Sequence, residues 1–115
     1  MVFSIFRKKD KNSDLDKELY TQLTELNRIG ERIDVTQAID EETANILNSL
    51  LLNISNLLEK KFQNTKDKFY SDAREAFVFF LNSQASKLPP RKKQGLWDIL
   101  IKKIPQIINK IQGYE

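Results

Sequence analysis

Apolar side chains recur at intervals of three and four residues along nearly the whole chain, and this spacing limits the fold more than any other feature. An α-helix places residues three and four apart on one face, whereas a half-buried strand alternates apolar and polar residues. The spacing therefore predicts amphipathic helices. Only residues 2–6 have the composition of a strand. The pattern is clearest near the start of the chain, at Leu15, Leu19, Leu23, Leu26, Ile29 and Ile33.

Start and stop signals divide the chain into four expected helices. Ser13 is expected to cap the first helix and Asp40 the second, because their side-chain oxygens can accept backbone N–H groups. Pro89 and Pro90 end the third, since proline lacks an N–H and disfavours helix in the preceding residue. Pro105 is expected to kink or break the fourth. The expected helices span residues 14–34, 41–63, 66–87 and 95–112.

The length and the short connections indicate how these helices assemble. A chain of 115 residues fits one domain, and helices joined by short connections pack as antiparallel neighbours. We therefore expect an all-α fold, a four-helix bundle or a related small helical array. This domain occupies residues 13–115, and an apolar and basic tail of residues 1–12 precedes it.

The composition excludes several classes of chemistry. The chain has no Cys and no His, which rules out disulfides, thiol or imidazole catalysis and the usual zinc sites. Its three glycines are scattered, so there is no glycine-rich phosphate loop. We expect no enzymatic activity, no cofactor and no metal. Without a convincing targeting segment, we expect the protein in the cytoplasm or at the inner face of the membrane.

Charge is distributed unevenly along the chain. Residues 13–59 carry three basic and ten acidic groups, whereas residues 60–115 carry twelve basic and five acidic groups. We expect the basic region 87–110, with a stiff exposed loop over 87–95, to contact an anionic partner, namely DNA or a nucleoprotein complex. Pairing with the acidic half of the same chain is the alternative. The candidate contacts are Lys87, Arg91, Lys92, Lys93, Lys102 and Lys103.

The second expected helix has an unusual outer face. Residues 43–58 carry no charge, although surface helices normally do. This face, which includes Ser55, is expected to be buried within the domain or to meet a protein partner or a second copy; an ordinary asparagine-rich surface is the third reading. On the third helix, Phe79 falls among polar residues, so it is covered by residues 2–6 or exposed for a partner. The candidate interface residues are Asn45, Asn48, Ser49, Leu52, Asn56 and Phe79.

Two segments favour an alternative function at a membrane surface. Residues 1–9 are apolar and then basic, and residues 95–112 form an amphipathic helix with Trp97 and several lysines. Both patterns are typical of interfacial anchors. The alternative prediction is therefore a peripheral membrane protein held by one or both segments. An amphipathic helix that buries its apolar side in a bundle would show the same pattern.

One stretch also resembles a known family. A long helix is followed by the sequence LPPRKKQGLW at residues 88–97 and then by DILIKK. This outline is similar to the all-helical domain of archaeal GINS replication-complex subunits, in which a Leu/Pro turn, a charged stretch and an aromatic-bearing helix follow long helices. The resemblance covers about residues 15–104 and implies a part in a replication-type assembly. The small β domain of that family has no counterpart here.

Overall fold

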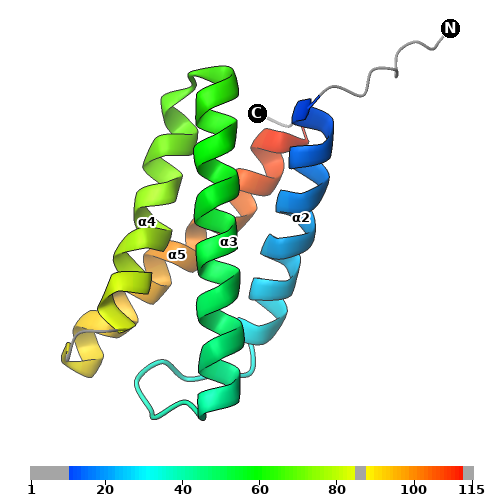
Figure 1. The fold of residues 1–115 in the computed structure, drawn as a ribbon. Coiled ribbons are helices and arrows are strands. Elements are labelled where there is room, and N and C mark those ends of the chain that lie inside the picture. Colours follow the sequence, from blue (N-terminus) through cyan, green and yellow to red (C-terminus); the bar gives the residue numbers. More distant parts are fainter. Residues whose placement is uncertain (1–10, 85–87, 113–115) are drawn as a thin grey trace, which may run out of the picture.

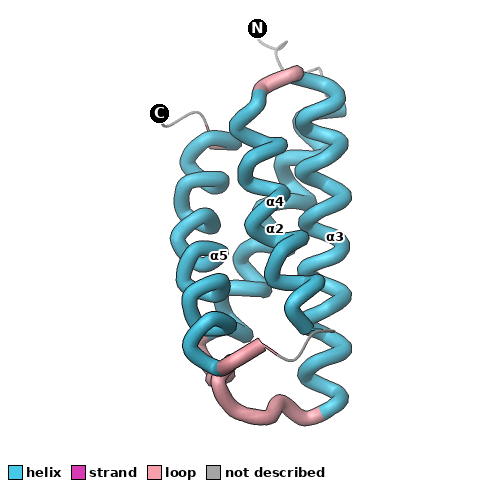
Figure 2. Tube along the Cα trace, turned by 90° about the vertical axis from the view of Figure 1, so that its left-hand side faces the viewer, coloured by secondary structure: helices cyan, strands magenta, loops and turns pink. Residues whose placement is uncertain are grey.

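The computed structural model describes residues 11–84 and 88–112, which form an antiparallel four-helix bundle (Figure 1). Each helix packs along two neighbours, in the order α2, α3, α4, α5 and back to α2, and no Cα atoms of the diagonal pairs lie within 8 Å of each other. The predicted all-α bundle is confirmed. Figure 2 shows the helices side by side along the long axis, with α3 and α5 on opposite sides. The helices are α2 (Lys11–Gly30), α3 (Glu41–Thr65), α4 (Lys68–Gln84) and α5 (Pro90–Ile111).

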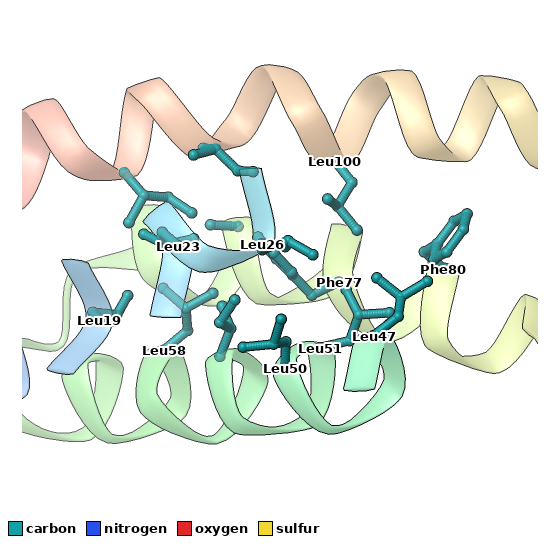
Figure 3. Close-up of a cluster of buried hydrophobic side chains, with 14 of the residues drawn as sticks. Leu19, Leu23, Leu26, Leu47, Leu50, Leu51, Leu58, Phe77, Phe80 and Leu100 are labelled. Atoms are coloured by element: carbon teal, nitrogen blue, oxygen red, sulfur yellow. The ribbon is translucent and has the colours of Figure 1, made fainter. Parts of the chain in front are cut away.

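All four helices contribute to one apolar core (Figure 3). Phe77 and Phe80 of α4 are the largest of the fully buried side chains in this core, and leucines of α2 and α3 surround them. Trp97 of α5 is buried in the core and packs against Phe80, with 4.9 Å between the ring centroids. Burying these faces removes a large apolar area from water, which is the main force that holds such a bundle together.

The first helix differs from the prediction at both ends. It begins at Lys11, so Ser13 lies inside its first turn and is not its cap. It ends at Gly30, four residues before the expected end, because the chain turns to bury Val35 in the core. Thr36 donates its backbone N–H (2.9 Å) and hydroxyl (2.6 Å) to Asp34 Oδ1, which closes this turn. The same hydrogen bonds lower the pKa of Asp34 below its ordinary value.

The second helix begins where the sequence predicts. The backbone N–H of Thr43 donates to Asp40 Oδ2 at 3.0 Å, which confirms the cap and lowers the pKa of Asp40. The helix ends at Thr65, two residues beyond the expected end. There Lys66 adopts the left-handed conformation (φ 59°) and donates its N–H to the carbonyl of Phe62 at 2.7 Å. This cap allows a tight turn into α4.

The fourth helix corrects the prediction of an exposed loop. It begins at Pro90, not near Gly95, because proline suits the first helical position, where its missing N–H has no partner to lose. It then runs without interruption to Ile111, so Pro105 does not divide it. Pro105 is exposed, which leaves water free to bind the carbonyl that loses its helical partner. The described part of the expected third helix runs to Gln84, and its expected last residues, 85–87, lie outside the described part.

A buried ion pair joins α2 to α3. Nζ of Lys61 lies 2.7 Å from Oδ1 of Asp16, and the lysine side chain is only 6% exposed while that of Asp16 is 28% exposed. The ammonium also lies 5.2 Å from the centre of the Tyr70 ring on α4. A charge this deeply buried is stable only with such partners. The pair therefore fixes how three helices meet near the α3–α4 turn.

Gly30 and Gly95 give a matched pair for testing helix packing. A methyl group on Gly30 would lie 2.9 Å from Cζ2 of Trp97, whereas one on Gly95 would meet nothing within 4 Å. Gly30→Ala is expected to lower the free energy of unfolding by about 1–3 kcal/mol because the indole must move. Gly95→Ala should raise it by about 0.5–1 kcal/mol, since alanine loses less backbone entropy in a helix. Urea unfolding measures both, and a fully stable Gly30→Ala variant would contradict the close contact.

Candidate nucleic-acid interface

Positive charge is concentrated on α5. This helix carries six basic residues and one acidic residue, whereas α2, α3 and α4 together carry seven basic and nine acidic residues. The difference lies in the outer surface, because the inner side of α5 is apolar. Trp97, Leu100, Ile104 and Ile107 of that side are buried in the core. The outer face of α5 is therefore the most basic helical surface in the described part of the chain.

Five basic residues of α5 lie at exposed or half-buried positions of the helix. Arg91, Lys92 and Lys102 are exposed, and Lys93 and Lys103 are half-buried. Within residues 11–84 and 88–112, none of these five lies within ion-pair distance of a carboxylate. The alternative to an anionic partner was that these residues pair with the acidic half of the same chain. Among the described residues, none of the five makes such a pair. Lys87 lies outside those residues. We call Arg91, Lys92, Lys93, Lys102 and Lys103 the basic face.

Lys110, by contrast, is engaged within the bundle. Its Nζ lies 3.1 Å from Oδ2 of Asp67 and 5.5 Å from the centre of the Phe69 ring. The pKa of Asp67 is lowered, first by the backbone N–H of Phe69 and then by Lys110. Lys110 thus anchors the C-terminal end of α5 to the start of α4, and it does not belong to the basic face.

The start of α5 places like charges together. Arg91, Lys92 and Lys93 occupy its first turn, Pro89 provides no side-chain cap, and no acidic residue lies in that turn. The N-terminal end of a helix carries partial positive charge, so cations there are unfavourable and anions are favourable. The start of α3 shows the ordinary arrangement, with Asp40 as cap and two glutamates in the first turn. The first turn of α5 therefore has a surplus of positive charge that a bound anion would reduce.

The outer face of α3 is exposed, so the expectation that the domain buries it is wrong. Asn45, Ser49, Leu52 and Asn56 are all exposed on it. The bundle is only one layer of helices around a core, and each helix keeps one side in water. Two of the alternatives stay predictions: the face binds a protein partner or a second copy of the chain, or it is an ordinary asparagine-rich surface. The face lies across the bundle from α5 (Figure 2), so the two candidate surfaces are separate.

Two expected members of that surface are already engaged within the bundle. Oδ1 of Asn48 accepts a hydrogen bond from Nε2 of Gln84 at 3.3 Å, and Asn48 is half-buried. Ser55 is buried, and its hydroxyl donates to the carbonyl of Leu51 at 2.8 Å. Both lie on the flank of α3 that packs on α4, because the helical wheel places them beside the core positions. They are therefore better described as part of the helix contact.

Phe79 is 56% exposed, and the structure adds a second apolar residue that sequence reasoning missed, Ile99, which is 52% exposed. Residues 2–6, the expected cover for Phe79, lie outside the described part of the chain. The signal for Ile99 was present in the sequence. It lies three residues before Lys102 and four before Lys103, a spacing that places all three on one side of a helix.

The described residues also bear on metal binding and on attachment to a membrane. No group of acidic side chains in the described ranges could hold a metal ion. No helix there is long and apolar enough to cross a membrane. The apolar side of α5, which made residues 95–112 a candidate interfacial anchor, is buried against the other helices. The other candidate anchor, residues 1–9, lies outside the described part.

Comparisons with known proteins give no relatives. No family model, no curated protein and no solved structure matches the chain. The likeness to the GINS helical domain thus remains a resemblance of sequence outline. Arguments about function accordingly depend on the charges and side chains of the described surface.

Proposed function

We propose that this protein is a non-enzymatic helical module that binds nucleic acid on the outer face of α5, as part of a nucleoprotein assembly. The observation that supports this most is the basic face. Its five cations have no carboxylate partner in the described chain, and three of them stand at an uncapped helix start. Phosphate groups suit both the cations and the helix start. They form ion pairs with Lys and Arg, and their oxygens accept hydrogen bonds from the N–H groups at a helix N-terminus.

Binding of this kind has a specific dependence on salt. Each neutralised phosphate releases bound counterions, so the logarithm of the association constant falls linearly with the logarithm of the salt concentration. Three or four contacts from the basic face should give a slope of roughly −2 to −4. The small area and the single helix favour backbone contacts over reading of base edges.

Charge reversal at the start of α5 tests the proposal. Lys92→Glu/Lys93→Glu is expected to weaken binding of a labelled oligonucleotide roughly 100-fold or more at low salt, measured by fluorescence anisotropy. The matched control is Lys17→Glu/Lys60→Glu, on exposed positions of α2 and α3, which changes the net charge by the same amount. It should bind within about threefold of the wild type, because general electrostatics alone is screened beyond about 10 Å.

The same reversal should not harm the fold. Acidic residues in the first turn favour a helix, so Lys92→Glu/Lys93→Glu should be at least as stable as the wild type. Loss of binding can then not be attributed to unfolding. Equal loss in both double variants, or unaltered binding in the reversed one, would overturn the proposed site. If the wild type floats with phosphatidylserine vesicles and does not bind nucleic acid, the basic face belongs to the alternative function, attachment to a membrane surface.

A further inference from the structure

The two most exposed of the large apolar residues in the described chain lie on the neighbouring helices α4 and α5. They are Phe79 on α4, at 56% exposure, and Ile99 on α5, at 52%. Single exposed apolar residues are common on protein surfaces. Two together beside a basic face are not explained by the packing of the bundle.

Two contacts between α4 and α5 show that Phe79 and Ile99 lie at the same level along the bundle. Phe80 packs on Trp97, and the ring of Phe69 lies against Lys110. The helices are therefore antiparallel, so residue numbers rise along α4 in the direction in which they fall along α5. Between those two contacts, this register places Phe79 opposite Ile99. Phe79 also lies four residues before Ser83, a buried residue three positions after Phe80, which packs on Trp97 of α5.

The basic face continues directly from this pair. Ile99 shares one side of α5 with Lys92, seven residues before it, and with Lys102 and Lys103, three and four residues after it. An exposed phenyl ring thus stands beside a line of cations that runs along α5. A cationic track with an aromatic ring at its edge is the arrangement that proteins use to hold single strands.

We infer that the nucleic acid bound by α5 is single-stranded, with its backbone along the basic face and a base stacked on Phe79. The inference rests on the proposed function and names its ligand class. A phenyl ring on a convex helix surface cannot reach the faces of bases stacked in a duplex, whereas an unpaired base presents its face freely. Ile99 provides the apolar neighbour against which the same nucleotide packs.

The charges on α4 favour a strand over a bilayer as the occupant. Glu75 and Asp72, one and two turns before Phe79, are both exposed and acidic. A flat anionic membrane that reached Phe79 and the basic face would also meet these carboxylates, which is unfavourable. A single strand follows α5 and can pass Phe79 without covering the outer face of α4.

Substitution of Phe79 tests the inference. Phe79→Ala should weaken binding of oligothymidylate roughly tenfold or more, while binding of a hairpin duplex stays unchanged. The slope of the salt dependence should also stay unchanged, because no charge is removed. Tyr20→Ala is the matched control, since Tyr20 is an aromatic residue 44% exposed on α2. It should bind oligothymidylate as the wild type does.

A tryptophan at the same position gives a direct readout of stacking. Phe79→Trp should keep oligothymidylate affinity within about threefold, since indole stacks at least as well as phenyl. Its exposed indole should be quenched when the strand binds. The native Trp97 is buried, and its fluorescence in the wild type reports the background.

The outcomes separate the inference from the proposed function. Wild-type affinity of Phe79→Ala for oligothymidylate, together with weak binding by Lys92→Glu/Lys93→Glu, would overturn stacking and leave the nucleic-acid site standing. No binding of either nucleic acid by the wild type would overturn both. A third outcome is that the wild type binds anionic vesicles but no nucleic acid, and that Phe79→Ala no longer floats with the vesicles. This result would assign the surface to a lipid and would overturn both the inference and the proposed function.

Discussion

Asp16→Ala is expected to lower the free energy of unfolding by about 3 kcal/mol, because it leaves a buried ammonium without its counterion. Lys61 is 6% exposed and lies 2.7 Å from Asp16, so water cannot replace the carboxylate without opening the contact between α2 and α3. The Tyr70 ring offers only a weak substitute. Urea or thermal unfolding followed by circular dichroism measures the loss.

Substitution of the other partner in the ion pair provides the control. Lys61→Met keeps the buried stem and removes the charge. The Asp16 side chain is 28% exposed, so part of it still meets water, although its Oδ1 is buried. We expect a change of less than about 1 kcal/mol, and Asp16→Ala/Lys61→Met should recover most of the stability lost in Asp16→Ala. A double variant as unstable as Asp16→Ala would contradict the explanation by an unpaired charge and would point to lost packing at Asp16.

Phe77→Ala is expected to cost about 3–5 kcal/mol, since truncating a fully buried phenyl ring leaves a cavity. Phe77 is 0% exposed and lies among leucines of the neighbouring helices (Figure 3). A domain of this size has a total stability of about 5–15 kcal/mol, so the variant should unfold at much lower urea concentration. The midpoint of urea unfolding is the measurement.

Phe79→Ala is the control for this prediction, because it removes the same ring two residues further along the same helix. Phe79 is more than half exposed, so the expected loss is less than about 1 kcal/mol. Similar losses at the two positions would show that α4 is rotated relative to the arrangement described. A stable Phe79→Ala variant is also what allows its effect on binding to be interpreted.

The fold could be predicted because the apolar spacing of the helices survives in the packed structure. Leu19, Leu23 and Leu26 are all buried as their spacing predicts. The ends were harder, because they depend on contacts distant in sequence. Gly30 ends α2 beside Trp97, some 67 residues away, and Val35 turns into a core that the local sequence does not specify. Pro90 was read as a terminator of one helix, although it starts the next.

The candidate site was predicted in part. The excess of Lys and Arg after residue 86 identified the basic region, but local sequence could not show which lysines are paired. Lys110 is paired with Asp67 across two helices, whereas Lys92 and Lys102 are not paired in the described chain. Pairing depends on the register of α4 against α5. The same register brings Ile99 level with Phe79, which no short-range pattern reports.

The ring of contacts around the core has a consequence for assembly. Since α3 and α5 occupy opposite corners of the bundle, a ligand on one of their outer faces leaves the other uncovered. If the proposed strand binds along α5 and a second protein binds along α3, the two ligands would therefore not compete for the same surface.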